Sequence, residues 1–297
     1  MGIEKKTLEH LIGNTPLVEI THLNTNPNVK IFCKLEGQNP GGSVKDRAAY
    51  GMISGAMERG EIKAGDQLVE ATSGNTGIAL AMIAQLKGLK MNLIMPDNST
   101  RERVLTMEAY GANVILTPAA KTIEYSRTLA EEMAATGDYQ MLNQFANQDN
   151  YGQHYKTTGP EIWKDTTGKI THFVSSMGTT GTIMGVSKYL KEQSKEVQIV
   201  GVQPTEGSSI PGIRRWSPEF LPKIYDPSRV DSIIDVSKDE AIDTTRALAK
   251  QEGILAGMSS GGALAAALKL AAQLKEGLIV SIVCDRGDRY LSSDLFG

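Results

Sequence analysis

Three glycine-rich loops each follow an apolar, strand-like run and lead into a helical pattern. They span residues 72–77 (TSGNTG), 178–182 (GTTGT) and 257–262 (GMSSGG). A helix N-terminus carries unpaired N–H donors and the positive end of the helix dipole, so it binds phosphate or carboxylate without needing an arginine. The three loops therefore predict several anion-binding turns, which parallel strands would bring together at the carboxyl edge of a sheet.

A lysine precedes all three loops, in the segment Ser-Val-Lys-Asp-Arg at residues 43–47. An amine among anion sites favours a phosphorylated aldehyde cofactor held by that amine as a Schiff base, and pyridoxal phosphate is the obvious candidate. Gly41 and Gly42 would leave room for a bulky cofactor beside Lys45. The alternative is a solvated charged turn at a helix start, which is the usual role of Lys-Asp-Arg.

The loop at 178–182 has the composition of a phosphate cradle. Two glycines allow the backbone to form a nest of N–H donors, and three threonines add hydroxyls. The residues concerned are Gly178, Thr179, Thr180, Gly181 and Thr182. The loop lacks the Gly-Lys-Ser/Thr ending of a nucleotide phosphate loop. A tight strand-to-helix turn without a ligand would use the same residues, so this loop alone decides nothing.

The other two loops are equally ambiguous when taken singly. In 72–77, Ser73, Asn75 and Thr76 offer donors for a substrate carboxylate, and Asn75 could reach a phenolic oxygen of the cofactor. Ser259 or Ser260 opens an apolar helix over 263–274 and could face the pyridine nitrogen. A neutral hydroxyl there would leave the ring unprotonated, which favours β-elimination and replacement over transamination. Both loops could instead be helix caps, and for the serines the sequence by itself favours the cap.

The elements that must position these residues alternate between strand and helix. Strands are predicted at 67–71, 91–95, 113–117, 171–175, 197–202, 232–236 and 278–284, and helices at 48–59, 78–86, 122–135, 183–193, 238–253 and 263–274. Thr122 is the expected cap of its helix, and Ser237 with Glu240 forms a capping-box pattern. Strands separated by helices predict an α/β fold with parallel-rich sheets covered on both faces.

Two Rossmann-like domains are the expected architecture. Residues 40–147 would form a smaller, mobile, substrate-gripping domain. Residues 1–39 plus 148–297 would form a larger cofactor-binding domain. The boundary is placed at the asparagine- and glutamine-rich stretch 143–150.

Composition excludes several other classes of function. The net charge of −3 over 297 residues gives no electrostatic case for binding nucleic acid. The sequence contains no run of 18 consecutive apolar residues, so no membrane span is predicted. The N-terminus lacks an apolar signal core, so a cytoplasmic protein is expected. Cys33 and Cys284 lie in apolar runs and are expected to be buried free thiols. The four histidines lack metal-ligand spacing, so no metal is expected.

Taken together, these segments resemble the pyridoxal-phosphate enzymes of fold type II, and among them the cysteine synthases (O-acetylserine sulfhydrylases). The motifs that carry the resemblance lie at 12–17, 43–47, 72–77, Pro96, 158–162, 178–182, 259–261 and 287–292. The segments 212–216 (GIRRW) and 284–290 (CDRGDRY) are similar to signatures of the B isozyme. The A isozyme has proline and serine where this chain has Cys284 and Asp285.

The resemblance implies a role for each matching residue. Lys45 would be the catalytic Schiff-base lysine. Asn75 would bind the cofactor's 3′-oxygen, residues 178–182 the phosphate, and Ser259 the pyridine nitrogen. Thr72, Ser73, Thr76 and Gln144 would grip the substrate carboxylate. Arg214, Cys284 and Asp285 would shape the site for the sulfur donor, with Asp285 repelling an anion unless it pairs with Arg286 or Arg289.

The activity that the resemblance implies is a transferase reaction in cysteine biosynthesis. Acetate in O-acetyl-L-serine would be replaced by sulfide, or by thiosulfate as in the B isozyme, and Lys45 would remove and return the α-proton. The partners would be these small molecules, together with a second copy in a homodimer. The alternatives are a serine/threonine dehydratase, a cystathionine β-synthase, or a catalytically silent regulatory paralogue.

Overall fold

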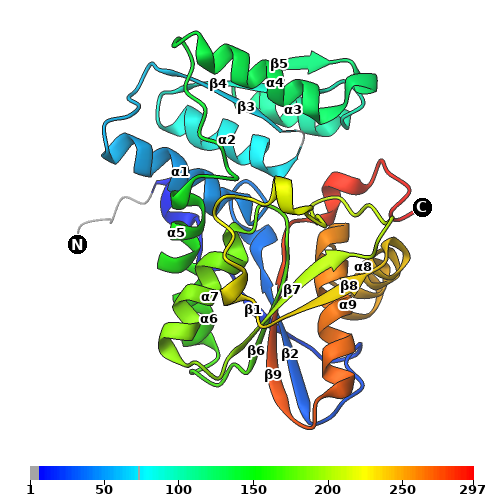
Figure 1. Cartoon of the computed structure of the whole chain (residues 1–297). Helices are drawn as coiled ribbons and strands as arrows, with labels where there is room; N and C mark the ends of the chain where they lie inside the picture. The colour runs from blue at the N-terminus through cyan, green and yellow to red at the C-terminus, as the bar shows by residue number, and fades with distance from the viewer. Residues whose placement is uncertain (1–6, 73) are drawn as a thin grey trace, which may run out of the picture.

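The computed structural model describes residues 7–72 and 74–297, which form two sheets wrapped by helices (Figure 1). The larger sheet has the strand order β1-β2-β9-β6-β7-β8, and the smaller sheet has the order β3-β4-β5. β1 pairs antiparallel with β2, whereas the other strand pairs described here are parallel. The larger sheet thus combines strands from both ends of the chain.

The strands and helices have the following bounds. The strands are β1 Leu17–Ile20, β2 Val29–Leu35, β3 Gln67–Ala71, β4 Lys90–Pro96, β5 Asn113–Thr117, β6 His172–Ser176, β7 Gln198–Pro204, β8 Ser232–Val236 and β9 Gly277–Val283. The helices are α1 Lys45–Glu58, α2 Asn75–Leu86, α3 Arg101–Ala109, α4 Thr122–Ala135, α5 Gln148–Lys156, α6 Thr158–Asp165, α7 Gly181–Gln193, α8 Lys238–Glu252 and α9 Met258–Gln273. Short 3₁₀ turns include η2 Glu36–Gln38 and η6 Gly287–Tyr290.

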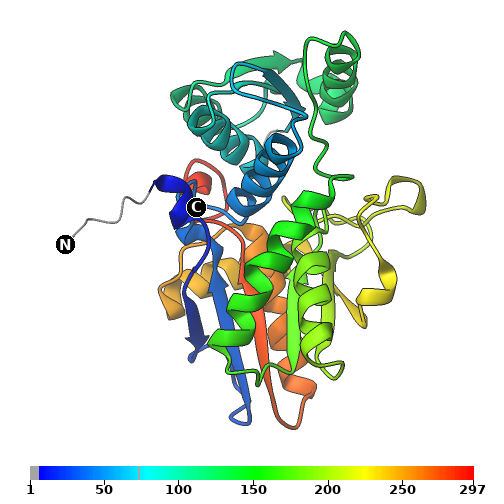
Figure 2. The same ribbon diagram turned by 90° about the vertical axis from the view of Figure 1, so that its left-hand side faces the viewer.

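Both faces of the larger sheet are covered, as a parallel sheet requires. Helices α5, α6 and α7 lie on one face, and α9 lies behind the strands on the other (Figure 2). Successive residues of β9 alternate between the two cores: Ile279 packs with Leu264 of α9, and Val280 packs with Ile183 of α7. The period of two along a strand places neighbouring residues on opposite faces.

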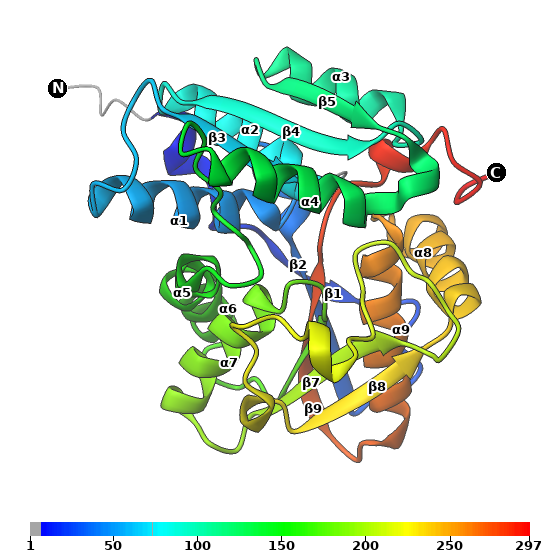
Figure 3. The ribbon, with the colours of Figure 1, turned by 45° about the horizontal axis from the view of Figure 1, so that its top comes forward.

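The smaller sheet lies above the larger one, with α1 between them (Figure 3). One face packs against α1 and α2, through residues such as Met52 and Leu80. The other face packs against α4, where Ala130 contacts the core around Ile94. This arrangement places the start of α1, which carries Lys45, close to the carboxyl ends of strands from both sheets.

The α/β fold with two parallel-rich sheets is confirmed, and so are the seven predicted strands, to within one or two residues. The capping box at Ser237 and Glu240 is present at the start of α8. Thr122 as a cap is wrong: its φ is +59°, and its hydroxyl contacts the Glu124 side chain rather than a backbone N–H.

Sequence reasoning missed α3, α5 and α6, and it began four helices too late, α1 among them. The helices α2, α7 and α9 start inside the glycine loops, so their first turns are built from loop residues. Both cysteines are free thiols, but only Cys33 is buried. Cys284 lies just after β9 and is partly exposed, because the strand ends at Val283.

Candidate active site

Lys45 is the first residue of α1, and its neighbours come from the end of β9. The Val44 N–H donates to the Cys284 carbonyl at 2.8 Å. Burial lowers the pKa of Lys45 from its ordinary value, while Cys284 and Asp285 act in the opposite direction. A lowered pKa makes the neutral amine, which is the nucleophilic and basic form, more available near neutral pH.

The charged-turn alternative for the lysine segment does not describe this structure. Asp46 and Arg47, the residues that follow Lys45, are completely buried, and Lys45 itself is half-buried. Arg47 forms a two-pronged ion pair with Glu36, through Nε at 2.7 Å and Nη2 at 2.8 Å. It also binds both carboxylate oxygens of Glu161 on α6, at 2.6 and 2.8 Å.

This buried ion network explains two motifs that carry no chemistry. Thr15, from the segment at 12–17, donates to Glu36 Oε1 at 2.6 Å, and Glu161 belongs to the segment at 158–162. Burial by itself would raise the pKa of Glu36, but the Arg47 guanidinium outweighs it and the pKa falls to about 2. Both partners are therefore charged, and they fix the start of α1 against η2 and α6.

The predicted phosphate loop forms the N-terminus of α7. Thr180 precedes the helix with a left-handed φ of +69°, and the Thr179 hydroxyl accepts from the Gly181 N–H at 3.4 Å. Thr182 lies 3.3 Å from Nε2 of His154. The Thr180 hydroxyl is buried and has no hydrogen-bond partner. A nest of backbone donors with one unsatisfied hydroxyl fits a phosphate group, so these residues suit the predicted cofactor.

The two serines at the start of α9 have different surroundings. Ser260 is buried, and its hydroxyl accepts the Cys284 N–H at 2.9 Å. The Ser259 carbonyl accepts from the Ser176 hydroxyl at 2.8 Å, and the Ser259 side chain faces Gly212. The Ser260 hydroxyl is therefore held by the backbone at the end of β9, whereas the Ser259 hydroxyl bonds to the Cys284 side chain.

Two of the predicted carboxylate-binding residues meet. Thr76 donates its hydroxyl to the Gln144 side chain at 2.8 Å, and both are buried. Thr72 lies at the end of β3, where its hydroxyl is 3.4 Å from the Gly74 N–H. Ser73 lies outside the described residues. The contact between Thr76 and Gln144 joins α2 to the segment that leads into α5.

Asn75 and Asp285 are bonded to each other across the two sheets. The Asn75 amide donates to Asp285 at 2.7 Å and accepts from Arg289 at 2.5 Å. Asp285 also accepts from the Tyr290 hydroxyl at 2.6 Å and from the Gly257 N–H at 3.1 Å. The donors in these bonds to the Asp285 carboxylate are all neutral groups. Arg289 donates to Asn75 rather than to Asp285. Arg286 pairs with Asp288 at 3.5 Å.

Cys284 is a neutral thiol beside Lys45. Burial, and then the charge of Asp285, raise its pKa to about 11. At neutral pH it therefore offers a small uncharged side chain rather than a thiolate.

Arg214 and Arg215 lie in one loop but have different surroundings. Arg215 binds the Pro204 carbonyl at 2.8 Å and pairs with Asp235, away from the loops. Arg214 is exposed, and its backbone N–H donates to the Met177 carbonyl at 2.8 Å, one residue before the phosphate loop. The pKa of Glu124 on α4 is lowered mainly by the Thr122 hydroxyl and to a lesser extent by the charge of the Arg214 guanidinium.

Sequence reasoning assigned no role to three residues that contact the loop at 178–182. Trp216 donates its indole N–H to the Gly178 carbonyl at 2.8 Å and packs edge-to-face on Phe145, with ring centroids 5.7 Å apart. His154 touches Thr182 and stays neutral, because burial and then the Arg47 charge lower its pKa to about 3. Asn150 contacts Thr179. Only the glycines of α7, which allow α5 to approach closely, hinted at such contacts.

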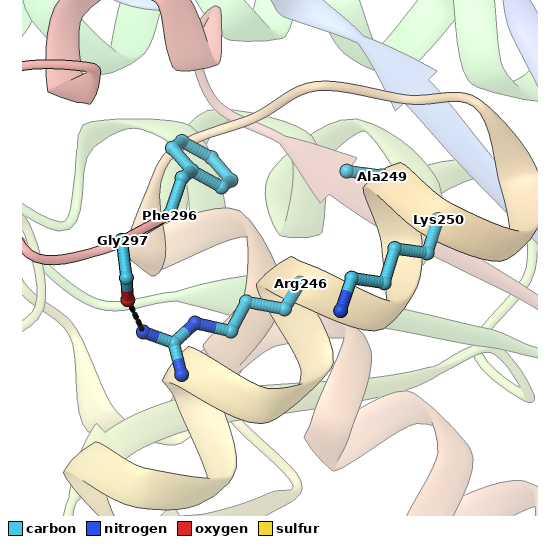
Figure 4. A pocket seen from close by; sticks show the side chains of 5 residues that line it. All are labelled: Arg246, Ala249, Lys250, Phe296 and Gly297. Carbon is cyan, nitrogen blue, oxygen red and sulfur yellow. Dashed lines mark hydrogen bonds between the residues drawn. The ribbon is translucent and has the colours of Figure 1, made fainter.

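Two cavities are lined by residues other than the predicted site residues. One, of about 330 Å³, is lined by Arg246, Ala249, Lys250, Phe296 and Gly297, where Arg246 binds the C-terminal residue (Figure 4). The other, of about 230 Å³, includes Gly41, Arg103 and Arg289. Of the predicted site residues that the structure describes, none lines either cavity. In the part of the chain that the structure describes, none of the helices has the length and apolar character that a membrane span requires.

Comparison with known proteins places this fold and site in one class. Residues 8–285 match the family described as "Pyridoxal-phosphate dependent enzyme". The chain is therefore a pyridoxal-phosphate-dependent enzyme.

Individual relatives narrow the class. The chain is 58% identical to "Cysteine synthase B" of Pseudomonas aeruginosa, over 100% of this chain and 99% of that protein. It is also 58% identical to "Cysteine synthase B" of Escherichia coli, over 98% and 96% of the two chains. The crystal structure of an O-ureido-L-serine synthase aligns with a TM-score of 0.93 and 36% identity, over 99% of this chain and 95% of that one. The chain belongs to the cysteine synthase family.

Proposed function

We propose that this enzyme makes L-cysteine by replacing the acetate of O-acetyl-L-serine with sulfide. The observation that carries the proposal is Lys45, a half-buried amine of lowered pKa at the start of α1, beside Cys284 and Asp285 at the end of β9. The identity to the two cysteine synthase B proteins supports the same reaction. The O-ureido-L-serine synthase shares the fold, so the fold alone does not select the nucleophile.

Each group of residues has a proposed task. Residues 178–182 and Ser259 would hold pyridoxal phosphate, Asn75 would bind its 3′-oxygen, and Lys45 would carry it. When bound, the cofactor supplies an electron sink that stabilises negative charge at the α-carbon of the substrate. Thr72, Ser73, Thr76 and Gln144 bind the substrate carboxylate and so orient the α-proton toward Lys45.

Lys45 then acts as the general acid–base. Its neutral Nζ removes the α-proton, the acetate leaves from the β-carbon, and sulfide adds there before Lys45 returns the proton. The neutral Cys284 thiol and the fully bonded Asp285 leave the sulfur-donor side without a free carboxylate. Arg214 would supply a cation, which suits thiosulfate as a second donor that gives S-sulfocysteine.

The two sheets would move relative to each other during this cycle. Residues 40–147 would be the smaller, mobile unit, and residues 1–39 plus 148–297 the larger one. The bond between Asn75 and Asp285 and the bond between Thr76 and Gln144 cross or adjoin this boundary, so substrate binding would change them.

The enzyme would act in the cytoplasm as a homodimer. Leu105 and Leu291 are 50% and 62% exposed, and they neighbour Arg103 and Tyr290, which contact each other. Exposed leucines on adjoining segments are typical of a surface that packs against another chain. Light scattering after size-exclusion chromatography would give the mass in solution, and a monomer at micromolar concentration would refute the dimer.

One absorbance titration tests the activity. Purified protein should show a visible cofactor band that changes on addition of O-acetylserine and recovers when sulfide is added, with release of acetate and cysteine. Release of pyruvate without a sulfide requirement would indicate a dehydratase, and condensation of serine with homocysteine a cystathionine β-synthase. A band that ignores O-acetylserine would indicate a silent paralogue.

A further inference from the structure

Asn150 contacts both halves of the proposed site. It lies in the first turn of α5 and is buried. Its Nδ2 donates to the Gln144 carbonyl at 2.8 Å and lies 3.3 Å from the Thr179 hydroxyl. Gln144 belongs to the carboxylate-binding group and Thr179 to the phosphate loop. One amide group therefore joins two segments that are 35 residues apart in the sequence.

Packing holds this amide in place. A Cβ at Gly181 would collide with Oδ1 of Asn150, so the side chain lies directly on the first turn of α7. Further along the same helix, a Cβ at Gly185 would collide with the Tyr151 carbonyl. On the other side, a Cβ at Gly51 of α1 would lie 2.6 Å from the Asp149 carbonyl. Helix α5 is thus wedged between α1, which carries Lys45, and α7, which carries the phosphate loop.

We propose that Asn150 is a positioning residue that couples the substrate-carboxylate segment to the phosphate loop. The inference rests on the proposed function and goes beyond it, since Asn150 need touch neither ligand. With its carbonyl held by Asn150, Gln144 keeps its side chain against Thr76. With its hydroxyl beside the same amide, Thr179 keeps the loop ready for phosphate. Loss of the amide loosens both segments together, so cofactor affinity and substrate KM change together.

The test compares Asn150→Ala with a matched control, Asn92→Ala. Asn92 is also buried, donates its Nδ2 to a backbone carbonyl (Leu68, 3.0 Å) and shares a bond with a side chain (Asn113, 2.9 Å). It lies near the start of β4, whereas the site lies at the carboxyl ends of the strands. Both variants lose the same kind of bonds, but only one loses them between the two loops.

Three quantities are measured for each variant: the Kd of pyridoxal phosphate for the apoprotein, the KM for O-acetylserine at saturating cofactor and sulfide, and kcat. Asn150→Ala should raise both the Kd and the KM about tenfold, the scale of one lost hydrogen bond, and leave kcat within about threefold. Asn92→Ala should lower the thermal midpoint and leave the Kd and KM unchanged. Asn150→Asp keeps the shape but loses both N–H donors and adds a charge beside the loop, so its Kd should rise further.

A double variant separates coupling from general loosening. Because Asn150 acts on the substrate through Gln144, Asn150→Ala should add little to the KM of a Gln144→Ala variant. The inference would be overturned if the two substitutions raised the KM of the double variant by the product of their separate effects. It would also be overturned if the Kd and KM values of Asn150→Ala and Asn150→Asp matched those of Asn92→Ala. Wild-type protein that makes no cysteine would overturn the proposed function itself. Normal wild-type synthesis with unaffected Asn150 variants would overturn the inference alone.

Discussion

The backbone N–H of Cys284 donates to the side-chain oxygen of Ser260 at 2.9 Å. This bond joins the end of β9 to the start of α9 and uses the hydroxyl of Ser260. The sequence alone could not say whether Ser259 or Ser260 faces a ligand. The Ser259 side chain is left facing Gly212, at the helix N-terminus. A single backbone contact thus gives two adjacent and identical residues different surroundings.

Replacement of Ser259 should change the cofactor spectrum more than the rate. Ser259→Ala should keep β-replacement within about tenfold, because a neutral hydroxyl contributes one ordinary hydrogen bond. Ser259→Asp should favour a protonated ring and shift the absorption band. Ser260→Ala serves as the control, since it should lower stability by about 1 kcal/mol and leave the spectrum unchanged. Identical spectra for wild type, Ser259→Ala and Ser259→Asp would mean that Ser259 does not face the ring.

Replacement of Lys45 should abolish turnover. Lys45→Ala and Lys45→Arg should each lower kcat at least about a hundredfold, the lower end for loss of a general acid–base group. The arginine variant keeps the positive charge but has no amine that can carry the cofactor. Both should keep a cooperative thermal transition, because Arg47 rather than Lys45 anchors the start of α1. A near-wild-type rate of cysteine synthesis in either variant would contradict the assignment.

Arg214 should decide between sulfur donors. Thiosulfate is a dianion, so Arg214→Ala should lower the kcat/KM for thiosulfate about ten- to a hundredfold. This loss corresponds to about 1–3 kcal/mol for a charge-assisted contact. The effect on sulfide should be much smaller. Arg215→Ala is the matched control, because Arg215 is committed to Asp235 and the Pro204 carbonyl. Equal losses for the two donors would leave Arg214 as a general structural contact.

The buried Glu70 should make stability depend on pH. Burial raises its pKa to about 7 from 4.5, although the Asn143 N–H and the Arg127 charge oppose this. Between these two values the folded state binds more protons than the unfolded state, so this contribution to stability falls as the pH rises from about 4.5 to 7. Glu70→Gln removes the contribution.

Urea unfolding at two pH values tests this. The Glu70→Gln variant should be more stable than wild type at pH 8, by up to about 3 kcal/mol for a shift of this size, and nearly equal to it at pH 4.5. Gln can still accept the Asn143 N–H, which Glu70 accepts at 3.1 Å, so the local structure is kept. A difference that is the same at both pH values would refute the titration of Glu70.

Much of this enzyme could be predicted from local sequence. Short continuous apolar runs predicted the strands, because a strand of a parallel sheet is buried on both faces and so consists mostly of apolar residues. Glycine and hydroxyl residues after β3 and β6 marked the turns that lead into helices, because such residues are preferred in these turns. The same patterns could not place α5, whose sequence is polar and whose position depends on the close approach allowed by Gly181 and Gly185.

The tertiary structure alone decided how the charged and polar groups are partnered. Asp46 and Arg47 look like a solvated turn in sequence, yet Arg47 is buried because Glu36 of η2 and Glu161 of α6 neutralise it. Likewise, Asp285 is satisfied by Asn75, and Asn150 joins Gln144 to Thr179, over separations that no local pattern records. The sequence by itself determined seven of the strands, six of the helices and the chemical types at their ends. The partners were decided by three-dimensional packing, because a hydrogen bond depends on where two chain segments meet rather than on the composition of either.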